Sequence, residues 1–490
     1  MLEKLRSAFD EMVVYKDLQK VFIFSSLKLP SFMRDWLIKN FADEEGHFEP
    51  DEINRFVHQY MPTPEEWQRI KSELVCDGKT VKLFAQIGIN IDTKTSEVNF
   101  SLPKFHLKPS ETVVDPYVWD KCKDELLTGT EVWGMIELGY RYPNGKSQKP
   151  NGKITLENFK NFCPYDVDLE YYKDARADFT PDEWIDVVLG AIDYNPAGYK
   201  GDGAWTSKMT MLSRILPFVE PRLNLVELAP KGTGKSYVYG QVSRYGWLAD
   251  GGQITRAKLF YDIQREAEGL ICWNDFVVID EVQKFQFGND GEMSSILKGY
   301  LENGVFRVGN HKGAAEAGLI LSGNIAMTTM NEDGYGNMFR ELPESFHESA
   351  LVDRFHGFIK GWKIPRMTDD LKVCGWALNS EYFTSILHLL RRDTLSRGVV
   401  DELIELPRDS DTRDTMAIKR IATAYMKLLF PHVRKPDEIT ALEFDRYCFR
   451  PAKEMRRVIK YQLGLLDPAE FGGKEIPKLE IRDRLCKKVS

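Results

Sequence analysis

One stretch near the middle of the chain, residues 224–236, constrains the fold more than any other. It reads NLVELAPKGTGKS, which is a short apolar run, a turn rich in glycine and proline, and then Lys235 and Ser236 at the start of a helical pattern. Gly232 and Gly234 allow successive backbone N–H groups to point at one spot, as binding of a phosphate requires. A strand, a glycine-rich turn and a helix in this order predict a phosphate-binding loop and, with it, binding of a nucleoside triphosphate.

The residues expected to touch the nucleotide form one continuous segment. Lys235 is suited to reach the β- and γ-phosphate oxygens, and the hydroxyl of Ser236 is a candidate ligand of Mg²⁺. Ala229 stands where the consensus has glycine, and alanine is small enough for that place. The alternative interpretation is an ordinary glycine turn ahead of a helix. The predicted nucleotide-binding residues are Pro230, Lys231, Gly232, Thr233, Gly234, Lys235, Ser236 and Tyr237.

A second apolar run, residues 273–281, ends in two carboxylates. Its sequence, WNDFVVIDE, is typical of a buried strand with Asp280 and Glu281 at its carboxyl end. Downstream of a phosphate loop, this pattern predicts that Asp280 holds Mg²⁺ through water and that Glu281 orients or deprotonates the attacking water. The two motifs together predict hydrolysis of the nucleotide.

Polar residues farther along the chain complete the predicted site. Asn324 ends the apolar run LILSGN, where it is placed to position the hydrolytic water; an ordinary turn asparagine is the alternative. Arg354 precedes a predicted strand and is a candidate arginine finger that reaches a neighbouring subunit's γ-phosphate, whereas a local surface pair with Asp353 is the competing interpretation. Arg413, near the start of a later helix, is the preferred second arginine over Arg420.

Basic side chains in three segments are candidates for contact with DNA. Residues 305–308 and 315–320 are predicted to flank the loop 309–313 as a β-hairpin with His311 and Lys312 at its tip. Lysines that follow phosphates bind without sequence preference and with strong salt dependence. A contact between subunits is the alternative for the hairpin, and a merely solvated loop is the alternative for residues 143–153. The candidates are Arg307, His311, Lys312, Lys284, Lys146 and Lys149.

Composition narrows the class of protein. The chain has 490 residues, more than one ordinary core accommodates, and a net charge of −8, so contact with nucleic acid needs a local basic patch. Its seven cysteines are scattered without a CxxC pair, which argues against a zinc site or a disulfide framework and favours the cytoplasm. No apolar run has the length of a membrane span, and the N-terminus has no apolar signal core, so no membrane association is expected.

The pattern of elements predicts five segments in an α/β protein. Helical periodicity dominates the first and last of them, alternation of apolar and polar residues the second, and a parallel sheet is expected in the fourth. The segments are a helical N-terminal domain (1–78), a β-rich domain resembling an OB barrel (79–170), a helical connector (171–222), the nucleotide-binding core with a helix over 255–268 (223–366), and a helical lid and tail (367–490).

The order of these motifs resembles that of AAA+ ATPases, and the hairpin before the Asn324 strand is similar to the branch that contains MCM helicases and Lon-related proteins. More closely, residues 1–465 resemble the BrxL family, the Lon-like AAA+ proteins of BREX phage-defence systems. The segments that carry this resemblance are NLVELAPKGTGKSYVYG, ADGGQITRAKLFYD, VVIDEV, GNI, DRFHGFIKGWKIP and TRDTMAIKR.

The resemblance implies an ATPase that uses ATP and Mg²⁺ and has an AAA+ P-loop core with a helical lid. It also implies assembly into a hexameric ring, or a double hexamer, that encircles DNA or translocates along it, together with other BREX-type defence proteins. The family usually carries a C-terminal Lon-like protease domain; after Ser410 the only serine here is Ser490, so no protease activity is expected. The alternatives are a Lon-type motor that remodels protein and a nucleotide-switched DNA-binding scaffold.

Overall fold

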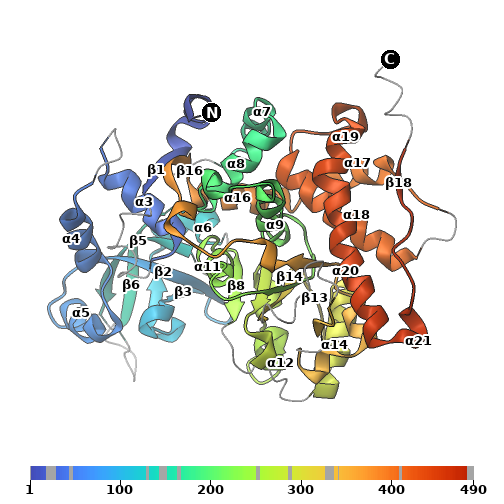
Figure 1. Cartoon of the computed structure of the whole chain (residues 1–490). Coiled ribbons are helices and arrows are strands. Elements are labelled where there is room, and N and C mark those ends of the chain that lie inside the picture. Colours follow the sequence, from blue (N-terminus) through green and yellow to red (C-terminus); the bar gives the residue numbers. More distant parts are fainter. Residues whose placement is uncertain are drawn as a thin grey trace. The chain divides into compact units, whose positions relative to one another are not determined.

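The computed structural model describes residues 2–17, 29–43, 48–127, 132–142, 152–162, 167–249, 254–284, 290–325, 336–339, 342–407 and 411–482 (Figure 1). These residues form two compact units. One unit contains residues 36–166, and the other contains residues 1–35 together with 167–490. This grouping cuts across the segments expected from the sequence, since the first 35 residues belong with the C-terminal part of the chain.

The unit of residues 36–166 is built on one five-stranded sheet in the order β3-β2-β5-β6-β4. Its elements are α4 (Pro50–Tyr60), α5 (Trp67–Val75), β2 (Val81–Asp92), β3 (Glu97–Ser101), β4 (Thr112–Val114), α6 (Pro116–Leu126), β5 (Val132–Arg141) and β6 (Lys153–Asn161). The 12-residue strand β2 is shared between two neighbours: its first half pairs with β5 and its second half with β3, both antiparallel. β4 and β6 run parallel.

A threonine hydroxyl links the two outer strands of this sheet. Thr112 of β4 is fully buried, and its Oγ accepts a hydrogen bond from the backbone N–H of Phe100 in β3 at 2.9 Å and donates one to the Phe100 carbonyl. Apolar side chains from the strands and from α5 and α6, such as Leu83 and Leu126, form one buried core. The expected β-rich region is therefore present, with its two edges brought together.

The larger unit is organised around a five-stranded parallel sheet in the order β15-β7-β14-β11-β8. Its strands are β7 (Leu225–Ala229), β8 (Gly246–Ala249), β11 (Phe276–Ile279), β14 (Gly318–Asn324) and β15 (Gly357–Lys360). All residues of β7 and β11 are buried, because helices and loops cover both faces of a parallel sheet. The predicted α/β class with a parallel sheet is confirmed.

Helices surround this sheet and form most of the C-terminal part of the unit (Figure 1). The helices that precede the sheet in the chain are α1 (Leu2–Phe9), α7 (Leu169–Ala177), α8 (Pro181–Ala191), α9 (Ala204–Ser213) and α10 (Leu216–Val219). The helix α3 (Ser31–Phe41) begins in this unit and ends in the smaller one. The helices that lie between the strands of the sheet along the chain are α11 (Lys235–Gln241), α12 (Arg256–Leu259), α13 (Leu270–Trp273), α14 (Asp290–Asn303) and α15 (Ser349–Val352). After it follow α16 (Ser380–Leu390), α17 (Leu395–Leu403), α18 (Thr412–Leu429), α19 (Ala441–Phe444), α20 (Arg450–Leu466) and α21 (Pro468–Phe471).

The periodicity of the N-terminal segment predicts helices alone, but the structure also contains a strand there. β1 (Val13–Asp17) pairs antiparallel with β16 (Cys374–Leu378). Its alternating burial explains the pairing, since Val14 and Lys16 are both buried and Lys16 forms an ion pair with Asp193 at 3.0 Å. A distant strand thus overrides a local pattern that is too short to decide between helix and strand.

The prediction of a helix over residues 255–268 is also wrong beyond the first turn of that helix. After α12, the chain forms a hairpin of β9 (Tyr261–Asp262) and β10 (Ala267–Glu268). The carboxylate of Asp262 accepts hydrogen bonds from the backbone N–H groups of Gln264 and Arg265, and Glu266 has a φ of +49°. Such a side-chain-capped turn competes with a helix at aspartate.

Candidate nucleotide-binding and hydrolysis site

The phosphate-loop segment connects β7 to α11 at the carboxyl end of the sheet. Gly232 and Gly234 have φ angles of +82° and +77°, a left-handed conformation that favours glycine. The expected strand, turn and helix are thus all present. The side chains of Lys231 and Ser236 are exposed, while Thr233 and Lys235 are buried against the sheet. Backbone N–H groups at the start of α11 are free to face an anion.

Residues from three parallel strands converge on this loop. The Lys235 ammonium donates a hydrogen bond to Oδ1 of Asn324, at the end of β14, at 2.8 Å. Burial lowers the pKa of Lys235, while the carboxylate of Glu227 acts in the opposite direction. The hydroxyl of Ser236 donates to Oδ2 of Asp280, just after β11, at 2.7 Å. The structure therefore brings Lys235, Ser236, Asp280 and Asn324 together, as the sequence predicts.

Asp280 is held from both sides. Its Oδ1 accepts hydrogen bonds from the hydroxyl of Ser322 and from the backbone N–H of Glu281, both at 2.9 Å. No cluster of three or more His, Cys, Asp or Glu side chains suited to a metal occurs in the described ranges. The Ser236–Asp280 pair fits Mg²⁺ instead, since that ion is commonly held by one or two protein oxygens, waters and the phosphates of the nucleotide.

Glu281 occupies an unusual backbone conformation, with a φ of +49°. Its carboxylate forms an ion pair with Lys284 at 2.7 Å, and the side chains are 40% and 71% exposed. Strained non-glycine residues cluster at functional sites, which agrees with a role for Glu281 in the reaction. Lys284, for which contact with DNA stays a prediction, is the partner of the predicted base in this exposed ion pair.

An ion pair beneath the loop was missed by the sequence interpretation. Arg214 and Glu227 are both fully buried, and their Nε and Oε1 atoms lie 3.0 Å apart. Arg214 also donates from Nη1 to the carbonyl of Thr233 at 2.7 Å and from Nη2 to its hydroxyl at 3.1 Å. The phosphate loop therefore rests on a buried guanidinium. No local pattern in the sequence marks this pair.

Tyr194 packs against the second glycine of the loop. Its hydroxyl is buried and has no hydrogen-bond partner among the described residues, and it would lie 2.1 Å from a Cβ atom added to Gly234. Both the positive φ and this close approach require glycine at position 234.

Substituting Gly234 by alanine is therefore expected to weaken ATP binding and to destabilise the fold by about 1–3 kcal/mol. The companion substitution Tyr194→Phe removes the clashing oxygen, so the double variant should recover the steric part of the loss. Equilibrium unfolding and nucleotide titration measure both effects. Equal losses in the single and double variants would contradict the proposed clash.

The side chain of Tyr237 points away from the loop. Its hydroxyl donates to Asp193 at 2.6 Å and accepts from Arg34 at 3.1 Å, within a buried cluster. Burial raises the pKa of Tyr237, and the adjacent carboxylate of Asp193 adds to this increase. Tyr237 was predicted to bind nucleotide. Because its side chain is part of this cluster, only its backbone, at the start of α11, is placed to contact a nucleotide.

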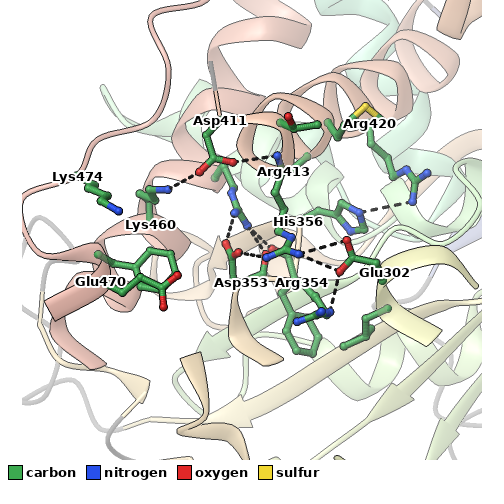
Figure 2. Close-up of a pocket in the computed structure, with 17 residues that line it drawn as sticks. Glu302, Asp353, Arg354, His356, Asp411, Arg413, Arg420, Lys460, Glu470 and Lys474 are labelled. Carbon is green, nitrogen blue, oxygen red and sulfur yellow. Dashed lines mark hydrogen bonds and ion pairs between the residues drawn. The ribbon is translucent and has the colours of Figure 1, made fainter. Parts of the chain in front are cut away.

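The predicted arginines gather in a second place. A cavity of about 730 Å³ is lined by Arg354, Arg413 and Arg420 together with charged residues that the sequence did not single out (Figure 2). The charged residues lining it are Arg354, Arg413, Arg420, Arg456, Lys460, Lys474, Glu302, Asp353, Asp411 and Glu470. Burial lowers the pKa of Arg420, and burial with the charges of Arg420 and Arg456 lowers that of the adjacent His356.

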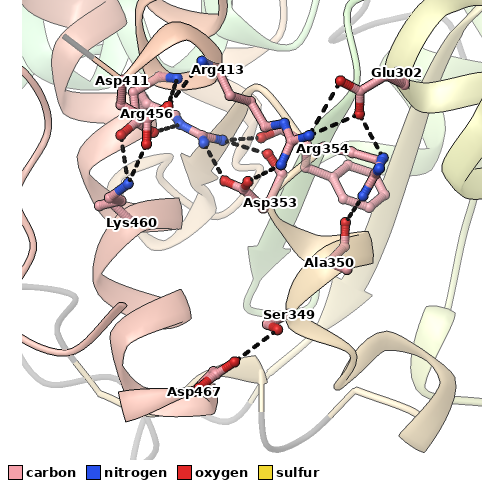
Figure 3. A network of polar contacts seen from close by, with 12 residues as sticks. Glu302, Ser349, Ala350, Asp353, Arg354, Asp411, Arg413, Arg456, Lys460 and Asp467 are labelled. Atoms are coloured by element: carbon pink, nitrogen blue, oxygen red, sulfur yellow. Dashed lines mark hydrogen bonds and ion pairs between the residues drawn. The ribbon is translucent and has the colours of Figure 1, made fainter. Parts of the chain in front are cut away.

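The local Asp353–Arg354 pair considered from the sequence is not what the structure shows. The carboxylate of Asp353 is bound by Arg413 and, at 2.6 Å, by the fully buried Arg456 (Figure 3). Arg354 instead forms an ion pair with Glu302 at 2.8 Å and donates to the carbonyl of Ala350. A local pairing rule missed this network because its partners come from α14, α18 and α20.

The two groups of residues lie at opposite edges of the sheet. Gly357 begins β15 and is paired with Leu225 at the start of β7, and the backbone of His356 bonds to Asn224. Arg354 therefore enters at the amino end of the strands, whereas the phosphate loop leaves β7 at its carboxyl end. The five-residue strand between them is about 15 Å long.

The hairpin contains β12 (Val305–Val308) and β13 (His311–Ala314), so its tip is Gly309-Asn310 and not His311-Lys312. Arg307 faces Lys312 across the pair, and both are exposed. The ring of His311 points the other way and stacks on Tyr261 of β9 at 3.7 Å. Side chains alternate between the two faces of a strand, so this alternation could have predicted that His311 and Lys312 lie on opposite faces of the hairpin. Lys146 and Lys149 lie outside the described residues.

Comparison with known sequences gives matches over most of the chain. The family described as "Lon-like protease BrxL-like, ATPase domain" matches residues 154–476, and "BREX system Lon protease-like protein BrxL N-terminal" matches residues 7–140. Two curated relatives are named "Lon-like protease BrxL". The one from Escherichia coli O9:H4 (strain HS) is 29% identical over 475 residues, and the one from Bacillus cereus (strain H3081.97) is 28% identical over 475 residues.

These alignments cover 95% and 96% of the present chain but only 65% and 67% of the respective relatives. The chain thus spans about two thirds of their length. In the described part of the chain, the helices are all too short or too polar to cross a membrane.

Proposed function

Because the chain belongs to the BrxL-like family of Lon-like ATPase-domain proteins, we propose that it is an ATPase whose active site is completed by a second copy of the same chain. In this proposal one copy supplies the phosphate loop and the hydrolytic carboxylate, and its neighbour supplies the arginines. A closed ring, such as the hexamer implied by the sequence resemblance, would repeat this interface at every subunit.

The proposed reaction assigns a role to each residue of the phosphate-loop half. Lys235 and the backbone of the loop bind the triphosphate. Mg²⁺ held at Ser236 and Asp280 would neutralise charge on the phosphate oxygens. Glu281 orients the water and accepts its proton, while Asn324 fixes the Lys235 side chain and faces the same water.

One observation carries the assignment of the arginines to a neighbour. Arg354 and Arg413 lie at the amino edge of the sheet, and the phosphate loop lies at its carboxyl edge, about one strand length away. An arginine side chain does not span that distance around a packed sheet. If these arginines stabilise the transition state, they do so on the nucleotide of an adjacent copy.

We further propose that DNA is the partner of this ATPase, in a role in BREX defence. The exposed pair of Arg307 and Lys312 supports contact with phosphates. The smaller unit supports it too: its order β3-β2-β5-β6-β4, with α6 between β4 and β5, fits an OB-like barrel, a fold used for binding single strands.

The experiment that tests the proposed function is ATP hydrolysis by the purified protein alone, with double-stranded DNA, with single-stranded DNA and with unfolded protein. Particle size is measured in parallel, and Glu281→Gln serves as the control that binds without hydrolysing. Stimulation by DNA together with nucleotide-dependent assembly is expected. Stimulation by unfolded protein alone would overturn the DNA assignment in favour of protein remodelling.

The hairpin allows a separate prediction about DNA. Arg307→Ala and Lys312→Ala should each weaken binding and reduce the slope of log K against log salt by about one unit, because each removes one phosphate contact. Arg392→Ala, which removes an exposed arginine after α16, is the charge-matched control. His311→Ala should leave the slope unchanged, since this ring is stacked on Tyr261. Fluorescence anisotropy over a salt series measures these slopes.

A further inference from the structure

Glu302 contacts two of the four arginines that line the cavity, Arg354 and Arg413. It lies at the end of α14, and its carboxylate accepts hydrogen bonds from Nη2 of Arg413 at 3.1 and 3.2 Å. The same carboxylate forms an ion pair with Nε of Arg354 at 2.8 Å. Figure 3 shows Glu302 on one side of both guanidinium groups, with Asp353 and Ala350 on their other sides.

Each arginine is thus held at two places, yet keeps donors for a ligand. Nε of Arg354 lies 2.8 Å from the Glu302 carboxylate as an ion pair without a hydrogen bond, and Nη1 donates to the Ala350 carbonyl. Among the described residues, the Nε and Nη2 groups of Arg354 therefore have no hydrogen-bond partner. Arg413 uses Nη1 for Asp353 and Nη2 for Glu302. A guanidinium has five N–H donors, so both side chains retain N–H groups for a phosphate.

Without Glu302, the positively charged guanidinium groups of Arg354 and Arg413 would repel each other, and neither would keep a fixed orientation. Asp353 does not replace it, because Asp353 is also bound to the buried Arg456. Glu302 is itself 44% exposed, so its contribution lies in the geometry of the arginines more than in the stability of the fold.

We propose that Glu302 is a positioning residue that holds Arg354 and Arg413 in the orientation required at the γ-phosphate of an adjacent copy. This inference rests on the proposed function. It adds a residue that does not touch the nucleotide but determines how well the arginines stabilise the transition state. Misplacement of a catalytic group by about 1 Å can cost on the order of 10²-fold in rate.

The test compares Glu302→Ala and Glu302→Gln with Glu316→Ala, a control that removes an exposed glutamate paired with a single arginine, Arg222. Glu302→Ala should lower kcat for ATP hydrolysis by about 10²-fold with KM nearly unchanged, because the nucleotide-binding half is intact. Glu302→Gln should fall between it and the wild type. An unchanged kcat in Glu302→Ala would overturn the proposal.

Mixing experiments separate positioning from a general structural loss. Glu302→Ala subunits should regain activity when mixed with Glu281→Gln subunits, which carry intact arginines, and should not regain it with Arg354→Ala subunits. The triple variant Glu302→Ala/Arg354→Ala/Arg413→Ala should be no less active than Arg354→Ala/Arg413→Ala. If Arg354→Ala itself has no effect, the proposed shared site fails; if only Glu302→Ala has none, the inference about Glu302 alone fails.

Discussion

Replacing Arg354 by alanine is expected to lower kcat for ATP hydrolysis by about 10³-fold or more, while ATP affinity stays nearly unchanged. The physical reason is that this guanidinium lies at the far edge of the sheet from its own phosphate loop, so that in the proposed function it acts on another copy's nucleotide. Steady-state hydrolysis and nucleotide titration measure the two quantities. Arg392→Ala, an exposed arginine outside the cavity, should behave as wild type.

Mixing two inactive variants gives a sharper form of this prediction. Arg354→Ala subunits keep Lys235 and Glu281, whereas Glu281→Gln subunits keep Arg354. In a random mixture, roughly a quarter of the interfaces combine two intact halves, so activity should return. Failure to return, with assembly preserved, would contradict the assignment of Arg354 to a neighbouring nucleotide.

Replacing Arg214 by alanine is expected to destabilise the larger unit by about 3–5 kcal/mol, because Glu227 would remain as an unpaired charge in the core. The Thr233 carbonyl and hydroxyl would also lose their donors, so ATP binding should weaken in the same variant. Chemical denaturation measures the loss of stability, and a nucleotide titration measures the loss of affinity.

The double variant Arg214→Met/Glu227→Leu provides the control for this prediction. It removes both charges and keeps the core filled, so much of the stability should return. Nucleotide affinity should stay low, since the phosphate loop still lacks the contacts from Arg214. Full recovery of affinity would show that the buried guanidinium does not support the loop. A small loss in Arg214→Ala alone would contradict the buried ion pair.

Comparison of sequence and structure separates two kinds of information. The phosphate loop, the strand before Asp280 and the strand ending at Asn324 were predictable, because each is a contiguous pattern whose backbone geometry follows from its own residues. The parallel sheet followed from several apolar runs that alternate with helices. A hairpin after Asn303 was also predictable, but its tip was placed two residues too late and its second arm was wrong. The second strand is His311–Ala314, whereas residues 318–320 of the predicted arm belong to β14 of the parallel sheet.

Other features depended on partners far along the chain. Short segments such as Val13–Asp17 and residues 261–268 have patterns compatible with helix or strand, and pairing with β16 or capping by Asp262 decides between them. An OB-like barrel, which was also expected, requires the sheet to close on itself. Such closure depends on several strands together and cannot be predicted from the pattern of one strand.

The sequence by itself thus determined the local structure of the loop between β7 and α11, since its residues are contiguous and its glycines set the backbone geometry. Only the tertiary structure decided which charges meet. Glu302 and Arg413 are 111 positions apart, and Arg214 and Glu227 are brought together only when α9 packs on the sheet. A buried or shared charge is stable only when neighbours in the folded protein compensate it. Those neighbours cannot be predicted from the periodicity of the sequence.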